Sequence, residues 1–296
     1  MDAALLVLAL AAILFGLQHA LWRSGPWVAA GAFLVLPLAL TPYWIRASGF
    51  DAFLWVKLYS VAACLCYGSL LRFTRLRECA SARTFVTVLL SLNILEAAVL
   101  SVYAGGTANL LNTLAALGLI VSLPWNSTAV RIGEGARREP YYHISRLWVV
   151  GYTVWNGAFV YLNYPEMTGY KIAVLGVPLV VGLIDPRRWL YARAATLGAY
   201  AYLLATFRQQ MGTQLDTTSW SNPTVGLVAA LASVVVAVIC VWHALAASRD
   251  AALDSPVRTG RMGALFHLSR RVVPCLPPRL QASRNSTSPA CRISKC

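Results

Sequence analysis

The sequence is short of charged residues, which make up 12% of its 296 positions, against about a quarter in a typical soluble domain. Hydrophobic residues make up 58% of it. A soluble chain of this length needs charge to cover its surface, so the deficit indicates that lipid surrounds most of the protein. The composition therefore excludes an ordinary soluble domain and predicts an all-α, polytopic transmembrane helix bundle.

The usual signatures of metal and cofactor chemistry are also missing. The seven cysteines form no CxxC pair, the four histidines are scattered, and no HExxH motif or phosphate-cradling glycine loop is present. No group of His and Cys residues has the spacing of metal ligands. We therefore predict no metal site and no cofactor, and the sequence leaves open whether the protein is an enzyme.

Long apolar runs fill most of the chain instead. Nine of them are long enough, or nearly long enough, to cross about 30 Å of hydrocarbon as helices. Their expected limits are 3–22, 27–45, 51–71, 84–104, 107–123, 147–164, 170–184, 188–206 and 224–247. The seventh is short and contains Pro178, so a re-entrant segment is the alternative there.

Arginine placement predicts the orientation of the bundle. With nine spans, the loops on the face opposite the N-terminus hold twelve basic residues, Arg193 included, while the N-terminal face holds Arg46, Lys171 and Arg208. Cytoplasmic loops carry the excess of Lys and Arg. We therefore expect a multi-pass membrane protein with its N-terminus outside and its C-terminus in the cytoplasm. A seventh segment that did not cross would contradict this pattern, which favours nine spans.

The chain divides into a helix bundle, residues 1–247, and a basic tail, residues 248–296. The formal net charge is +14, and the tail holds nine basic and two acidic residues. Charge placed in short loops and a tail suits anionic lipid headgroups rather than nucleic acid. The tail is expected to be either disordered or a short helix on the anionic inner leaflet.

Two charges inside neighbouring apolar runs are expected to meet. A charge at the bilayer centre costs about 2.5–3.5 kcal/mol or more, so such residues face the bundle interior. At 1.5 Å per residue, Lys57 lies about 9–10 Å and Glu96 about 12 Å from the same membrane face. Matching depths on sequential antiparallel helices predict a buried ion pair between Lys57 and Glu96.

Amide and aromatic side chains fall at a similar depth on other runs. The predicted polar layer consists of Lys57, Asn93, Glu96, Asn112, Trp155 and Asn156. Two interpretations stay open: these side chains hold helices together, or they line a solvated, ligand-binding cavity. So much buried polarity is costly unless the protein uses it.

Several short pieces occur in a fixed order along the chain: WVKLYS (55–60), NILEA (93–97), LPWN (123–126), YTVWNGAFVY (152–161), RAATL (193–197) and NPT (222–224). In this order and spacing they resemble an uncharacterised family of mostly bacterial multi-span membrane proteins, catalogued as a domain of unknown function. The resemblance implies an integral membrane protein of eight or nine helices. It implies no activity, cofactor or catalytic residue.

Three functions remain as hypotheses. The first is a carrier or binding protein for a small molecule, with the polar layer as its site. The second is a membrane-embedded enzyme acting on a lipid or isoprenoid, with Glu96 as the candidate catalytic acid. The third is a non-catalytic scaffold whose basic tail recruits a partner or anionic lipid. An open, lipid-accessible pocket beside Glu96 would favour the second over the first.

Overall fold

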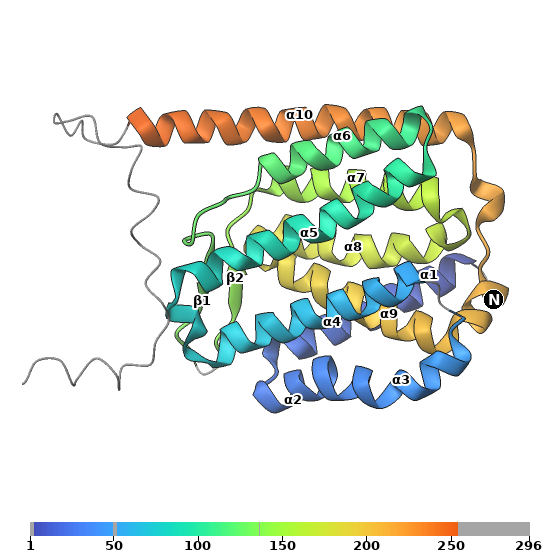
Figure 1. Cartoon of the computed structure of the whole chain (residues 1–296), viewed down its shortest axis with the longest axis horizontal. Helices are drawn as coiled ribbons and strands as arrows, with labels where there is room; N and C mark the ends of the chain where they lie inside the picture. The colour runs from blue at the N-terminus through green and yellow to red at the C-terminus, as the bar shows by residue number, and fades with distance from the viewer. Residues whose placement is uncertain (1–2, 50–51, 136, 254–296) are drawn as a thin grey trace, which may run out of the picture. The chain divides into compact units, whose positions relative to one another are not determined.

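The computed structural model describes residues 3–49, 52–135 and 137–253, and this part is almost entirely helical (Figure 1). The predicted all-α fold is confirmed. The helices are α1 (Ala3–Arg23), α2 (Pro26–Ala30), α3 (Leu36–Ala47), α4 (Ala52–Phe73), α5 (Ala80–Ala104), α6 (Thr107–Val121), α7 (Arg146–Asn163), α8 (Thr168–Ile184), α9 (Trp189–Gln214) and α10 (Pro223–Leu253). Short turns are η2 (Arg75–Glu78), η3 (Pro165–Met167), η4 (Pro186–Arg188) and η5 (Thr218–Trp220).

Helices α2 and α3 form one membrane-length rod. They are joined by a π-helical turn, η1 (Gly31–Val35), and Pro42 lies inside α3. A π turn widens the helix locally, and a proline removes one backbone donor. Thr41 next to this proline donates its hydroxyl to the Pro37 carbonyl at 2.7 Å. In spite of the π turn and the proline, the rod is one continuous helical segment from Pro26 to Ala47.

Six helical segments in the described residues are long and apolar enough to cross a bilayer: Ala3–Arg23, Pro26–Ala47, Ala52–Phe73, Ala80–Ala104, Pro165–Ile184 and Pro223–Arg249. They fit a multi-pass membrane protein. The count of nine spans stays a prediction, because α6 is shorter and α7 and α9 carry more polar residues. Helix α8 continues unbroken past Pro178 and belongs to a segment long enough to cross, which favours a span over the re-entrant alternative.

Two helices extend beyond the apolar runs from which they were predicted. Helix α9 was expected to end at residue 206, but it resumes after a kink at Phe207 and reaches Gln214. Helix α10 continues to Leu253, into the segment expected to be tail. Helical hydrogen bonding does not depend on apolar side chains, so hydropathy alone misplaces both ends. The tail prediction otherwise concerns residues 254–296, which lie outside the described residues.

The polar loop between α6 and α7 contains two short strands that the sequence analysis did not predict. Strands β1 (Val130–Ile132) and β2 (Pro140–Tyr142) pair antiparallel, with Val130 opposite Tyr142 and Ile132 opposite Pro140. Val130 and Tyr142 are buried, and the Tyr142 hydroxyl lies 3.1 Å from that of Thr87 on α5. We call this end of the helices the hairpin end.

The helices pack as two half-bundles with separate apolar cores. The first half-bundle consists of α5, α6, α7 and α10, with Ile94, Leu119 and Val149 at its centre. The second consists of α1, the α2–α3 rod, α4, α8 and α9, with Leu14 and Val174 at its centre. Figure 1 shows α10 lying along α6, at the edge of the first half-bundle. Trp189 and Leu71 join the first core near the hairpin end, so the two half-bundles share apolar contacts there.

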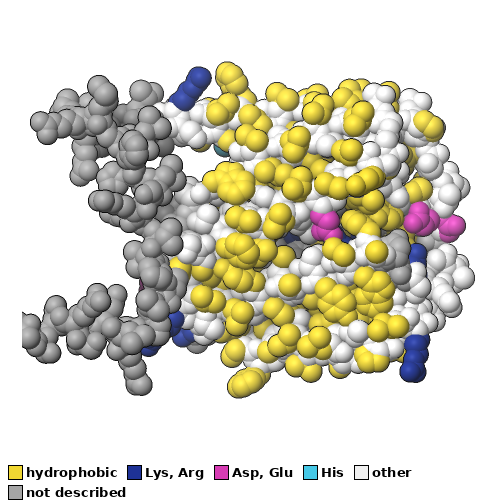
Figure 2. All heavy atoms as spheres, viewed as in Figure 1, with side chains coloured by type: hydrophobic (Ala, Val, Ile, Leu, Met, Phe, Trp, Pro, Cys, Tyr) yellow, Lys and Arg dark blue, Asp and Glu magenta, His cyan; other side chains and the backbone are white. Residues whose placement is uncertain are grey.

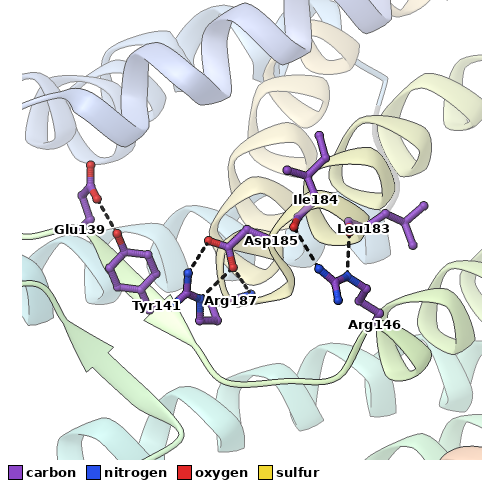
Figure 3. A network of polar contacts seen from close by, with 7 residues as sticks. All are labelled: Glu139, Tyr141, Arg146, Leu183, Ile184, Asp185 and Arg187. Atoms are coloured by element: carbon purple, nitrogen blue, oxygen red, sulfur yellow. Dashed lines mark hydrogen bonds and ion pairs between the residues drawn. The ribbon is translucent and has the colours of Figure 1, made fainter.

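Side chains at the hairpin end hold backbone carbonyls and loop carboxylates in place (Figure 3). Arg146 donates to the last carbonyls of α8, at 2.8 Å to Leu183 and 3.3 Å to Ile184. Asp185 accepts from the Arg187 guanidinium at 2.9 and 3.1 Å, and this contact lowers the pKa of Asp185. The Tyr141 hydroxyl donates to Glu139 at 2.6 Å and lowers the pKa of that carboxyl.

Arg72, at the end of α4, binds carbonyls from two other segments and is fully buried. Its Nη2 donates to Trp22, near the end of α1, and to Arg137, both at 2.9 Å. Its Nε donates to Arg138 at 3.1 Å. The last carbonyls of a helix lack intrahelical donors, and a cation there also interacts favourably with the negative end of the helix dipole. Arg72 therefore joins α1, α4 and the hairpin segment.

We predict that Arg72→Ala lowers the free energy of unfolding by about 2–4 kcal/mol, because several hydrogen bonds from one charged group are lost together. Thermal unfolding of the detergent-solubilised protein, followed by tryptophan fluorescence, measures the effect. The control is Arg75→Ala, since Arg75 is exposed on the neighbouring turn. Equal midpoints for the two variants would show that the Arg72 contacts contribute nothing.

Candidate functional site

Lys57 on α4 and Glu96 on α5 form an ion pair between the two half-bundles. Lys57 Nζ lies 3.0 Å from Glu96 Oε2, and the two side chains are 19% and 20% exposed. The pair expected from matching depths on antiparallel helices is therefore present. Glu96 Oε1 is buried and has no hydrogen-bond partner among the described residues. The carboxylate thus keeps one oxygen free to accept a further hydrogen bond.

A cleft between α4 and α5 leads to this pair from the side of the bundle. Helix α4 packs more extensively on α9 than on α5, and two hollows of about 500 and 540 Å³ lie between α4 and α5. Glu96 lines both hollows, and Asn93 lines the larger one. The remaining lining is mostly apolar, including Val56, Ala63 and Leu92. Figure 2 shows an acidic side chain in a hollow at the middle of an otherwise hydrophobic face.

Asn112 and Trp155 join helices of the first half-bundle. The Trp155 indole donates to the Asn112 backbone carbonyl at 3.0 Å, and both residues are fully buried. The Trp155 ring packs against Tyr152 and Phe159, with centroids 5.5 and 6.4 Å away. This arrangement fits the structural interpretation for Trp155. The Asn112 amide itself has no hydrogen-bond partner among the described residues, so its own role is not explained by packing.

Asn156 contacts a charged residue that the sequence analysis placed at the membrane surface. Arg193, on α9, is 6% exposed. Its Nε donates to the Tyr152 hydroxyl at 3.2 Å, and its Nη2 lies 3.5 Å from Asn156 Oδ1. Its Nη1 is buried without a hydrogen-bond partner in the described part of the chain. Arg193 therefore makes a second polar contact between the half-bundles.

Lys171, on α8, was also counted as a surface charge and is instead partly buried in the bundle. Its ammonium lies over the ring of Tyr200, 4.3 Å from the centroid. The positive charges of Arg193 and Lys57 are both near enough to act on it. Three cations from three helices of the second half-bundle thus repel one another. Lys57 was predicted, and the RAATL piece, which begins at Arg193, is the sequence signal that could have pointed to Arg193.

The predicted polar layer is therefore found as separate contacts. Lys57 and Glu96 pair directly, Asn93 shares the cleft with Glu96, and Asn156 contacts Arg193. Asn112 and Trp155 contact each other within the first half-bundle. Ligand binding by any of these residues stays a proposal. We call the contacts between the half-bundles, Lys57–Glu96 and Arg193 with Tyr152 and Asn156, the polar seam.

Comparison with known proteins places the chain in a family. The sequence profile of a family of unknown function (DUF5692) matches residues 1–256. The chain belongs to DUF5692. No match was found among curated proteins or solved structures.

The DUF5692 match agrees with the resemblance seen in the sequence pieces, which run from residue 55 to residue 224. It covers the described helices, including the whole of α10, and ends at residue 256. The family brings no known activity. The features of this DUF5692 chain that bear on its function are therefore the cleft and the polar seam.

We predict that Lys57→Met and Glu96→Gln each lower the free energy of unfolding by about 2–3 kcal/mol. Each leaves an uncompensated charge, although the pair is less buried than those for which about 3–5 kcal/mol is typical. The double variant Lys57→Met/Glu96→Gln recovers about 1–2 kcal/mol relative to the sum of the single effects, as expected for two residues in contact.

The matched control is the pair Arg77 and Glu78, whose closest atoms are 3.9 Å apart and whose side chains are 30% and 67% exposed. Neutralising both should change stability by less than about 0.5 kcal/mol. If the Lys57 and Glu96 effects simply add, the two charges do not interact in the folded protein.

Proposed function

We propose that the protein is a carrier for a small amphiphilic molecule, which enters from the bilayer between α4 and α5 and binds at the Lys57–Glu96 pair. The observation that carries this proposal is the lateral cleft with Glu96 in its lining. Ligand sites in proteins are mostly apolar hollows of about 300–1,000 Å³ with a few polar groups that orient the ligand. The two hollows have this size and this composition.

The division into half-bundles supports a carrier in particular. Many carriers work by rocking one helix group against another around a site between them. Lys57–Glu96 and Arg193–Asn156 both link one half-bundle to the other. A polar ligand group that competes for these contacts changes how the half-bundles hold together, which is what coupling of binding to movement requires.

A membrane-embedded enzyme on a lipid substrate is the second candidate. The pocket beside Glu96 opens to the side of the bundle, which by itself favours an enzyme. The carrier stays first because Glu96 is the one carboxylate among the described residues that line the two hollows and its pair with Lys57 joins the half-bundles. One carboxylate oxygen of Glu96, Oε1, has no hydrogen-bond partner among the described residues. In this case Glu96 would act as general acid. Chemical conversion of a bound lipid, lost in Glu96→Gln, would establish the enzyme; transfer of an unchanged molecule would establish the carrier.

We also propose that the hairpin end faces the cytoplasm. Its turns, loops, strands and helix ends hold Arg75, Arg77, Arg83, Arg131, Arg137, Arg138, Arg146, Arg187 and Arg188. Arg193 and Lys171 are no longer counted among the basic residues at the membrane surface, because they lie in the bundle. The excess of basic residues at the hairpin end remains without them. Excess Lys and Arg mark the cytoplasmic side. The scaffold hypothesis rests on the tail beyond the described residues and stays a prediction.

Filling the cleft tests the proposed route. Ala63 is exposed on the cleft wall, so Ala63→Phe places a ring where the ligand would lie. We expect native mass spectrometry to show a co-purifying lipid-like molecule on the wild-type protein, with occupancy reduced at least about tenfold in Ala63→Phe, since the ring costs the ligand more than 1.4 kcal/mol of binding.

The matched control is Ala232→Phe, because Ala232 is also exposed but lies on α10. This variant should keep the bound molecule at the wild-type level. Undiminished occupancy in Ala63→Phe, or a wild-type protein that carries no such molecule, would contradict entry through the cleft.

A further inference from the structure

The bundle interior holds more positive than negative charge. Besides Arg72, Arg83, Arg146 and Arg208, which lie toward helix ends, the described helices of the polar seam and α8 carry three cations against the single carboxylate of Glu96. These cations are Lys57, Lys171 and Arg193. The ion pairs of the described residues are Lys57–Glu96, Arg77–Glu78 and Arg187–Asp185. Neither Lys171 nor Arg193 therefore has a carboxylate partner there.

Arg193 uses little of its hydrogen-bonding capacity. A guanidinium has five N–H donors in a flat fork that fits a carboxylate or phosphate. Two of its nitrogens reach Tyr152 and Asn156, at 3.2 and 3.5 Å, and Nη1 has no partner in the described residues. The ring of Tyr152 adds a cation–π contact at 5.6 Å. A buried charge of this kind is costly unless something pairs with it.

Lys171 extends the same positive region. The charges that act on its ammonium, those of Arg193 and Lys57, are both positive, and its described contact is the face of Tyr200. The carboxylate of Glu166, in η3, acts on Tyr200 as well. Lys57 connects this positive region to the cleft, since its charge acts on Lys171 and its partner Glu96 lines the cleft.

We propose that the molecule bound by this protein carries an anionic group, a phosphate or a carboxylate, held by Arg193 and Lys171 and shared with Lys57. This inference rests on the proposed function. Glu96 then acts as a competitor: it neutralises Lys57 when the site is empty and is displaced from Lys57 when the anion binds. The apolar cleft holds the hydrocarbon part of the same molecule.

Three probes with the same hydrocarbon chain test the charge of the ligand: hexadecyl phosphate, hexadecanol and hexadecylamine. The full chain is placed in phosphatidylcholine nanodiscs, and radiolabelled hexadecyl phosphate is displaced by each probe. We expect hexadecyl phosphate to bind at least about tenfold more tightly than hexadecanol, because charge-assisted hydrogen bonds contribute that much or more. Hexadecylamine should bind more weakly than hexadecanol.

The variants have opposite expected signs. Arg193→Gln and Lys171→Met each weaken hexadecyl phosphate binding by about tenfold, because each removes one charged donor. Glu96→Gln strengthens it, since the competing carboxylate is gone, and Arg75→Gln leaves it unchanged. Arg193 also bonds Tyr152 and Asn156, so Lys171→Met and Glu96→Gln decide the outcome if Arg193→Gln does not fold.

Preference for hexadecylamine, or weaker hexadecyl phosphate binding in Glu96→Gln, would overturn the anionic ligand while leaving the cleft as a site. Binding of inorganic phosphate that depends on Lys171, without binding of hexadecyl phosphate, would support the anion and overturn entry from the bilayer. Absence of binding by every probe, inorganic phosphate included, would overturn both proposals.

Discussion

The structure depends on one contact between opposite charges in a lipid environment, the ion pair of Lys57 with Glu96. Apolar helices gain little from packing on each other in a membrane, because lipid tails are as apolar as leucine side chains. In a membrane, polar contacts between helices therefore help to determine which helices pack together, a role that hydrophobic burial has in water. The pair links α4 to α5 where the two helices otherwise contact each other at few points, and its carboxylate lines the cleft.

The same constraint explains how packing and polarity are distributed. Each half-bundle has its own apolar core, and the two cores merge near the hairpin end around Trp189 and Leu71. Arg72 and the hairpin reinforce that end by binding carbonyls from several segments. The half-bundles also pack on each other along α7 and α8. The polar seam adds contacts between α4 and α5 and between α9 and α7, and a polar ligand group can compete for these contacts.

The sequence predicted the fold class and the central pair because both follow from periodicity and depth. Lys57 and Glu96 lie well inside apolar runs, so helix rise alone brings them to one level. Arg193 and Lys171 were missed because each lies within about two turns of a predicted span end, where a long cationic side chain usually extends to the membrane surface. Their orientation depends on partners such as Tyr152 and Tyr200, which sit on other helices. The strands Val130–Ile132 and Pro140–Tyr142 were missed because each has three residues within a polar loop.

The central claim is that Lys57 and Glu96 attract each other across the half-bundles and organise the site around them. Charge reversal tests it most directly, with thermal unfolding of the purified variants as the measurement. Lys57→Glu and Glu96→Lys each place two like charges together, so each single variant should unfold at a much lower temperature than the wild type. The double reversal restores opposite charges, and we expect it to recover most of the lost stability. A double variant no more stable than the weaker of the two single variants would contradict the account.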